Sequence, residues 1–217
     1  AALVEHGPDL IDRFVPGDTL ATFSGLTRGV LTAERTAMNL IQHLSGVATL
    51  TAEYVDTLQG LPCRVCDTRK TTPGLRYLEK EAVADGGGAN HRHTLFHGVL
   101  IKENHITAAG GITEAIHKVR GIAPHILRVE VEVGCMEQMR EALAAGADII
   151  MLDNMSLEEM AQAAKEAHGQ KVLLEASGNI TLERLRAIAA TGVDFISVGA
   201  LTHSAPAVDL SLLITNG

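Results

Sequence analysis

The sequence has few of the residues on which nucleic-acid and membrane proteins depend. It contains no Trp, two Tyr and four Phe, so aromatic side chains on which bases could stack are scarce. Its formal net charge of -8 is opposite to the basic surface that a phosphate backbone requires. No apolar run is long enough to cross a bilayer. We therefore expect a protein that binds neither nucleic acid nor membranes.

The first residues do not match a secretory signal, because polar residues and a proline interrupt any apolar region there: Glu5, His6, Pro8 and Asp9. We therefore expect a cytoplasmic protein. With 217 residues, 46% hydrophobic and 20% charged, the chain can bury one sizeable core, or one domain and a fragment of a second.

Cysteine is also scarce, and the three residues are Cys63, Cys66 and Cys135. An odd number without a signal segment argues against a disulfide framework. Cys63 and Cys66 have the CxxC spacing of redox and zinc motifs. They begin an expected strand, however, where residues three apart face opposite sides, and no second CxxC completes a zinc site. We interpret these cysteines as core thiols.

From residue 64 onward, short β-branched runs alternate with amphipathic helical stretches. Capping signals agree, with Ser156 and Thr181 before helical stretches and Gly146 and Gly192 after them. Strands that are apolar throughout and alternate with helices belong to a parallel sheet covered by helices. We predict strands at 64–68, 99–103, 128–133, 148–153, 172–177 and 195–199, and helices at 113–120, 136–145, 157–167 and 182–190.

A β/α barrel and a doubly wound sheet both fit this alternation. A doubly wound sheet usually carries a GxGxxG fingerprint after its first strand, and the sequence has none. Polar residues follow nearly every predicted strand, which is where a barrel builds its active site. The sequence therefore favours a TIM-like β/α barrel, incomplete and with fewer than eight regular units.

The N-terminal residues lack this alternation. Residues 17–21 and 29–31 indicate short strands and turns, and a long helix is expected from residue 34 to about residue 58. Residues 1–33 are too few to bury a core of their own, so we interpret them as a remnant of a second domain.

Cationic residues follow two of the predicted strands. Arg69 and Lys70 come after the first strand, and Lys102 ends the second. Arginine offers a planar fork for a carboxylate and lysine a mobile charge for a phosphate. A solvated surface turn is the alternative for Arg69 and Lys70. His91 and Arg92 add cationic groups, and we favour a functional role for His91 over a structural one, while His105 stays open between the two.

Acidic residues come from the following strands. Glu130 and Glu132 alternate with valines, so both point to one face, and Asp153 ends the next strand. Such carboxylates can hold Mg²⁺ or stabilise a positive sugar ring in a transition state. The alternative is that they neutralise the basic residues across the barrel mouth.

The last two predicted strands end in small polar residues, which suit a phosphate because glycines let backbone amides approach it. Late barrel loops are the usual phosphate site of this fold. The candidate residues are Ser177, Gly178, Asn179, Ser197, Gly199 and Ala200. From the residues alone, we expect a barrel that binds a small molecule carrying both phosphate and carboxylate groups.

The sequence resembles the quinolinate phosphoribosyltransferases in segments that run in order from about residue 17 to the end. These are ERTAMN at 34–39, LSGVAT at 44–49, DTRKTTPGLR at 67–76, GGGANHR at 86–92, LIKENH at 100–105, VEVEV at 129–133, MLDN at 151–154, EASGNI at 175–180 and ISVGALT at 196–202.

The resemblance implies phosphoribosyl transfer from 5-phosphoribosyl 1-pyrophosphate to quinolinate with decarboxylation, in NAD biosynthesis, with Mg²⁺ as cofactor. It implies residues 1–40 as part of an N-terminal α/β sandwich domain, with the C-terminal segment as a candidate addition, and residues 41–217 as the catalytic barrel. A homodimer or higher homo-oligomer is expected, with Arg35 reaching the partner's site.

The residue roles implied by the resemblance divide between the two substrates. Lys70, Lys102, Glu132 and Asp153 would be catalytic, and the last two would also hold Mg²⁺, partly through water. Quinolinate would contact Arg35, Arg69, His91, Arg92 and Lys102. Phosphoribosyl pyrophosphate would contact Lys70, Glu132, Asp153, Ser177, Gly178, Asn179, Ser197, Gly199 and Ala200.

Two other functions remain open at this point. A related phosphoribosyltransferase-like protein of molybdate transport operons shares the Arg-Lys and His-Arg motifs, but tends to lack the segment at 101–105. An inactive barrel acting as a binding partner is the other alternative, and the presence of every candidate polar residue argues against it.

Overall fold

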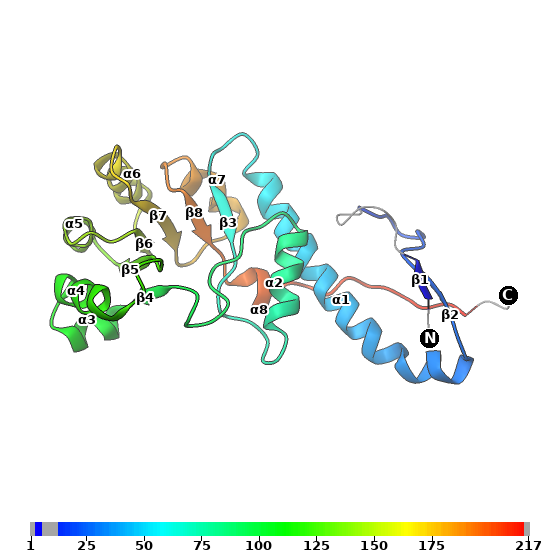
Figure 1. Ribbon diagram of the computed structural model, residues 1–217. Helices are drawn as coiled ribbons and strands as arrows, with labels where there is room; N and C mark the ends of the chain where they lie inside the picture. Colours follow the sequence, from blue (N-terminus) through cyan, green and yellow to red (C-terminus); the bar gives the residue numbers. More distant parts are fainter. Residues whose placement is uncertain (1–2, 6–12, 215–217) are drawn as a thin grey trace.

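The computed structural model describes residues 3–5 and 13–214, and within them the main sheet has six parallel strands (Figure 1). Each forms where the predicted β-branched run lies. Their bounds are β3 Arg64–Cys66, β4 Val99–Ile101, β5 Val129–Val133, β6 Ile149–Asp153, β7 Leu173–Ser177 and β8 Phe195–Ser197.

The strand order is β3-β8-β7-β6-β5-β4. Each strand from β4 to β7 therefore lies beside the next one in sequence, and β3 follows β8, without the reversal of order that defines a doubly wound sheet. In the described residues β3 does not pair with β4, although Cys66 forms a parallel bridge with Ala89, in the segment between α2 and β4. This is the incomplete barrel predicted from the sequence.

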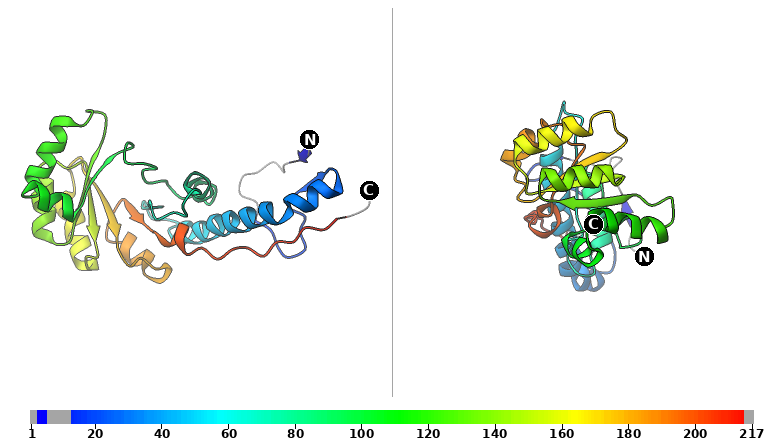
Figure 2. Two further views of the ribbon diagram at one scale, coloured as in Figure 1. Left: turned by 90° about the horizontal axis from the view of Figure 1, so that it is seen from below. Right: turned by 90° about the vertical axis from the view of Figure 1, so that its left-hand side faces the viewer.

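Helices cover the outer face of the sheet, as Figure 2 shows from two directions, and they pack apolar side chains against it. The four predicted in the barrel are confirmed as α4 Ile112–Ile122, α5 Met136–Ala144, α6 Leu157–Ala167 and α7 Leu182–Ala189. Helix α6 begins with a capping box in which the Ser156 hydroxyl accepts a hydrogen bond from the Glu159 amide. Val131, Ile150 and Ile196 are fully buried between sheet and helices.

Three helices were not predicted: α2 Arg76–Asp85, α3 Glu103–Ala109 and α8 Ala200–His203. Two of them have seven residues or fewer, too short for a periodic signal. The N-cap residue of helix α3 is Lys102, whose backbone N–H donates to His105 Nδ1 at 3.0 Å. This contact gives His105, left open by the sequence, a capping role.

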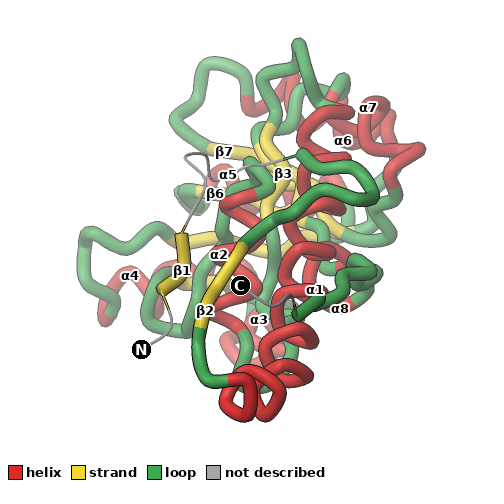
Figure 3. The backbone as a smooth tube through the Cα atoms, turned by 90° about the vertical axis from the view of Figure 1, so that its right-hand side faces the viewer, coloured by secondary structure: helices red, strands yellow, loops and turns green. Residues whose placement is uncertain are grey.

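The N-terminal prediction was partly wrong. Helix α1 spans Thr27–Thr57, so the expected strand at 29–31 is helical, and residues 17–21 contain no strand. Instead β2 Thr22–Ser24 pairs antiparallel with β1 Leu3–Glu5 (Figure 3), and this pair lies away from the parallel sheet (Figure 1). The helix runs through the expected domain boundary at residues 40 and 41. That boundary remains a prediction, and residues 1, 2 and 6–12 lie outside the described part.

Helix α1 extends away from the barrel, and the C-terminal segment runs back along it (Figure 1). The Val208 N–H donates to the Gln42 carbonyl at 3.0 Å, and Gln42 Nε2 donates to the Leu210 carbonyl at 2.9 Å. Gly46 permits the close approach, because a Cβ there would lie 2.1 Å from the Pro206 carbonyl oxygen. None of the helices in residues 13–214 is long and apolar enough to span a membrane.

Candidate active site

The predicted site residues that end or directly follow a strand lie at one edge of the sheet, because parallel strands end on the same side. Arg69 and Lys70 follow β3, and Lys102 follows β4. The carboxylates come from the C-terminal parts of β5 and β6, at Glu132 and Asp153. Ser177 and Ser197 are the last residues of β7 and β8. These residues therefore share one edge of the sheet, while their roles remain predictions.

Lys102 Nζ forms a hydrogen-bonded ion pair with Glu132 Oε2 across β4 and β5. The Lys102 side chain is 49% exposed, so its ammonium stays accessible to a ligand. Glu132 and Glu130 point to the same face of β5, as the alternation with valine predicted. In this pair, the Glu132 carboxylate therefore neutralises a neighbouring cation, as the alternative interpretation of the sequence expected.

A chain of amide contacts links the ends of β6 and β7. Asn154 Nδ2 donates to Asp153 Oδ2 at 2.9 Å, and Asn179 Nδ2 donates to Asn154 Oδ1 at 2.9 Å. Gly178, at φ +91°, leaves room for Asn154, since a Cβ would lie 2.3 Å from Asn154 Oδ1. This arrangement fixes the Asp153 carboxylate and brings the candidate phosphate loop beside it.

The other candidate phosphate loop, after β8, lies against Lys70. A Cβ at Gly199 would lie 3.1 Å from Lys70 Cδ and 3.1 Å from His203 Nε2. The Thr202 hydroxyl donates to the Lys70 carbonyl at 2.8 Å. Lys70 and the loop at Ser197, Gly199 and Ala200 therefore form one cationic corner. Thr202 and His203 were not selected from the sequence, because a lone Thr and a lone His carry little signal.

Arg69 and Arg92 carry like charges near each other. Burial and the charge of Arg69 lower the pKa of Arg92, and Arg92 Nη1 donates to the Gly98 carbonyl at 3.1 Å. Two guanidinium groups held in this way would both be stabilised by one anion. The arrangement suits a ligand with carboxylate groups.

His91 points into the barrel and contacts two buried carboxylates. Its Nε2 lies 3.0 Å from Glu130 Oε2 and 3.8 Å from Glu175 Oε2. The Arg92 N–H donates to His91 Nδ1 at 2.8 Å. Burial lowers the pKa of His91, but the two carboxylates outweigh it and raise it overall. The amide at Nδ1 nevertheless favours the neutral ring with its proton on Nε2.

Glu130 and Glu175 each have one oxygen, Oε1, without a hydrogen-bond partner in the described residues. Burial and the charge of Glu130 raise the pKa of Glu175 to about 7. His91, Glu130 and Glu175 have potential metal-ligand atoms within 4.8 Å of one another. A metal on His91 Nε2 would move the proton to Nδ1, against the Arg92 N–H, so the geometry opposes a metal there. The sequence did not single out Glu175.

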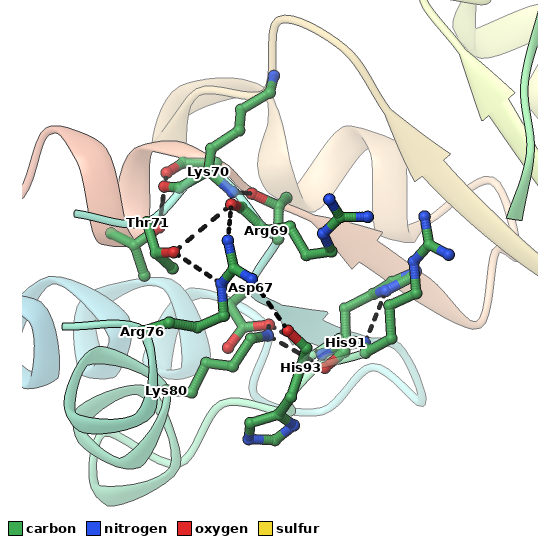
Figure 4. A network of polar contacts seen from close by, with 12 residues as sticks. Asp67, Arg69, Lys70, Thr71, Arg76, Lys80, His91 and His93 are labelled. Atoms are coloured by element: carbon green, nitrogen blue, oxygen red, sulfur yellow. Dashed lines mark hydrogen bonds and ion pairs between the residues drawn. The ribbon is translucent and has the colours of Figure 1, made fainter. Parts of the chain in front are cut away.

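At the start of the loop that follows β3, Asp67 forms a fully buried ion pair with Lys80 (Figure 4). Asp67 Oδ1 also accepts a hydrogen bond from the His91 N–H at 2.8 Å, and Lys80 Nζ donates to the His91 carbonyl at 3.0 Å. Burial raises the pKa of Asp67, while Lys80 counteracts this. Lys80 was missed in the sequence because its burial depends on tertiary packing.

A cavity of about 320 Å³ opens inside the barrel, toward the N-terminal ends of the strands. His91, Arg92, Glu130 and Glu175 line part of it, but Lys70, Lys102 and Asp153 do not. Apart from His91 and Arg92, the candidate active site is therefore defined by the contacts at the C-terminal edge and not by this cavity.

Two predictions concern residues outside the cluster. Arg35 lies on the exposed N-terminal half of α1, with its side chain 73% exposed, and does not join the site of its own chain. Cys63 and Cys66 are buried thiols, as predicted, whereas Cys135 is only half-buried.

The sequence comparisons identify the family. Residues 47–213 match the family model described as "Quinolinate phosphoribosyl transferase, C-terminal domain". The chain belongs to the quinolinate phosphoribosyltransferase family. A probable nicotinate-nucleotide pyrophosphorylase [carboxylating] of Bacillus subtilis is 46% identical over 99% of this chain and 78% of its own length. One from Synechocystis is 49% identical over 90% of this chain and 67% of its own length.

Solved structures of the quinolinate phosphoribosyltransferase family agree with this assignment. The nicotinate-nucleotide pyrophosphorylase from Francisella tularensis aligns with a TM-score of 0.90 at 47% identity, covering 97% of this chain and 74% of that one. NadC from Streptococcus pyogenes aligns with a TM-score of 0.89 at 44% identity, covering 96% and 73%. These relatives do not favour the molybdate-operon alternative or the inactive barrel.

Proposed function

We propose that the protein transfers a phosphoribosyl group from 5-phosphoribosyl 1-pyrophosphate to quinolinate, releasing pyrophosphate and CO₂ and forming nicotinate mononucleotide. The observation that carries this proposal is the convergence of cationic groups after β3 and β4 with carboxylates from β5 and β6, and with polar loops after β7 and β8, onto one edge of the barrel. Membership of the family supports the same reaction.

Quinolinate, a pyridine with two carboxylates, requires several fixed cations. Arg69 and Arg92 supply two close guanidinium groups, and Lys102 a third, partly exposed charge. His91, held by Glu130 and by the Arg92 amide, offers a fixed ring edge next to Arg92 in the sequence. This set suits the carboxylates and orients the ring nitrogen toward the second substrate.

The phosphoribosyl donor is proposed to bind on the opposite side of the cluster. Lys70 and the loop at Ser197, Gly199 and Ala200 form the cationic corner for a phosphate. The loop at Ser177, Gly178 and Asn179 lies next to Asp153 through Asn154. Glu132 and Asp153 would contact the ribose from the strand ends.

Mg²⁺ is part of the proposal, and the donor set fits it. Glu132 and Asp153 are half-buried carboxylates from neighbouring strands, which are the hard oxygen ligands that Mg²⁺ prefers. When bound, Mg²⁺ would neutralise charge on the leaving pyrophosphate.

The chain's own residues then account for the chemistry. As pyrophosphate leaves C1 of the ribose, Glu132 and Asp153 stabilise the positive charge that develops on the ring. The quinolinate nitrogen attacks C1 and becomes a pyridinium, which accepts electrons as the adjacent carboxylate departs as CO₂. Lys102 stabilises the resulting carbanion until it is protonated.

We also propose that the protein acts in the cytoplasm as a homodimer or larger homo-oligomer, with Arg35 contributing to the quinolinate pocket of the partner. The exposed position of Arg35, on a helix that extends beyond the barrel, supports such a contact (Figure 1).

The test is quinolinate-dependent release of CO₂ in the presence of phosphoribosyl pyrophosphate and Mg²⁺. We expect Arg69→Ala to raise the quinolinate KM by about 10-fold or more, because a carboxylate contact is lost. Lys102→Ala should lower turnover, whereas Lys165→Ala, on the exposed face of α6, should change neither. An unchanged KM in Arg69→Ala, or unchanged turnover in Lys102→Ala, would contradict these roles.

A further inference from the structure

One face of helix α2 carries three polar residues at helical spacing, Arg76, Glu79 and Lys80. Glu79 and Lys80 have no exposed surface. Buried charges destabilise a fold unless partners compensate them, so such a pair indicates a specific role. All three residues have partners in the two segments that carry the proposed substrate contacts, and Glu79 has a further partner in α1.

Lys80 contacts the segment of the proposed quinolinate pocket. It pairs with Asp67 and donates to the His91 carbonyl, while Asp67 accepts from the His91 N–H. Both backbone polar groups of His91 are thereby fixed. Since Arg92 directly follows His91, these contacts also fix the backbone position from which the Arg92 side chain extends.

Glu79 contacts the segment of the proposed phosphoribosyl site. Its Oε2 accepts a hydrogen bond from the Thr72 N–H at 3.0 Å, two residues after Lys70. Its Oε1 accepts from His43 Nε2 of α1 at 2.8 Å. Glu79 therefore fixes the Lys70 loop to both α2 and α1.

Arg76 joins the two segments to each other. Its Nε donates to the Thr71 hydroxyl at 2.9 Å and its Nη2 to the Arg69 carbonyl at 3.3 Å. Its Nη1 donates to the His93 carbonyl at 3.2 Å (Figure 4). One guanidinium group thus bridges the loop after β3 and the segment before β4, across the edge where β3 and β4 do not pair.

We propose that Arg76, Glu79 and Lys80 are positioning residues that hold the two substrate-binding segments in register, Lys80 for quinolinate, Glu79 for the phosphoribosyl donor and Arg76 for both. This inference rests on the proposed function. None of the three is assigned a contact with substrate. Their effect is to fix the backbone from which the contacting side chains extend, where small displacements strongly reduce the rate.

The experiment compares the two KM values in each variant, with the other substrate saturating. Lys80→Met should raise the quinolinate KM by about 10-fold and change the donor KM by less than about 2-fold. Glu79→Gln should raise the donor KM by about 10-fold and change the quinolinate KM by less than about 2-fold. Arg76→Met should raise both, and Glu81→Gln, exposed on the same helix, should change neither.

Removal of Lys80 alone leaves the buried Asp67 carboxylate without its counter-charge, which can prevent folding. The double variant Asp67→Asn/Lys80→Met is electrically neutral, and the introduced amide oxygen still accepts from the His91 N–H. The double variant should fold and should raise the quinolinate KM by less than Lys80→Met does. If Lys80→Met does not fold, the double variant replaces it in the comparison.

Equal rises in both KM values for Lys80→Met or its double variant, or wild-type values for both, would overturn the inference, since a general loss of structure does not discriminate between substrates. The wild-type assay separates this result from a failure of the proposed function. An unmodified protein without quinolinate-dependent CO₂ release would reject the function itself.

Discussion

Glu175 is a carboxylic acid in a buried environment. It lies inside the barrel beside Glu130 and His91, with one oxygen unpartnered in the described residues. Because its pKa rises to about 7 from a usual value of 4.5, the folded protein keeps this proton when the unfolded chain has already lost it. Stability therefore falls as the pH rises from about 4.5 to 7, and no further above that.

Glu175→Gln should remove this dependence, because the amide stays neutral at every pH. We expect the variant to match the wild type near pH 4.5 and to be more stable at pH 8 by up to about 3 kcal/mol. Urea unfolding at the two pH values measures the difference. Glu53→Gln, exposed on α1, is the control. A difference between Glu175→Gln and wild type that is the same at both pH values would contradict this account.

At the level of elements, α1 depends on glycine at one contact. Gly46 faces the backbone of Pro206 in the returning C-terminal segment, so a methyl group there would force backbone to move. Gly29, in the same helix, has open space around it. The two glycines therefore have opposite expected effects when replaced by alanine.

Gly46→Ala should destabilise the protein by about 2 kcal/mol or more, because the clash is with backbone and not with a flexible side chain. Gly29→Ala should stabilise it by up to about 1 kcal/mol through helix propensity alone. Thermal unfolding of both variants tests the pair. If Gly46→Ala were as stable as Gly29→Ala, the C-terminal segment would not pack on α1 as described.

The strands and outer helices were predictable because their apolar spacing repeats over several residues and their caps agree. The site residues at strand ends were predictable for a related reason, since polar residues such as Lys102 and Asp153 interrupt apolar runs abruptly. Helix α2 was not, because its sequence contains charges that would ordinarily face solvent. Only the packing of α1 and the β3 loop around Glu79 and Lys80 makes them internal.

For the whole molecule, the assembly is the main open prediction. If Arg35 completes the partner's pocket, two inactive variants should restore each other. A mixed dimer of Arg35→Ala and Lys102→Ala subunits contains one site with both residues intact. Random reassociation of equal amounts should therefore recover about a quarter of the wild-type activity. No recovery after confirmed subunit exchange would place Arg35 outside the partner's site.

Helix α1 carries Arg35 and, eight residues later, His43, which contacts Glu79. The two positions are about 12 Å apart along one continuous helix. In an assembly where Arg35 contacts the neighbour's quinolinate, binding of that quinolinate would change the position of α1. Through His43 and Glu79, α1 would then displace the loop that binds the phosphoribosyl donor in the other subunit. Substrate binding in the two subunits would then be cooperative, and the influence would act equally in both directions.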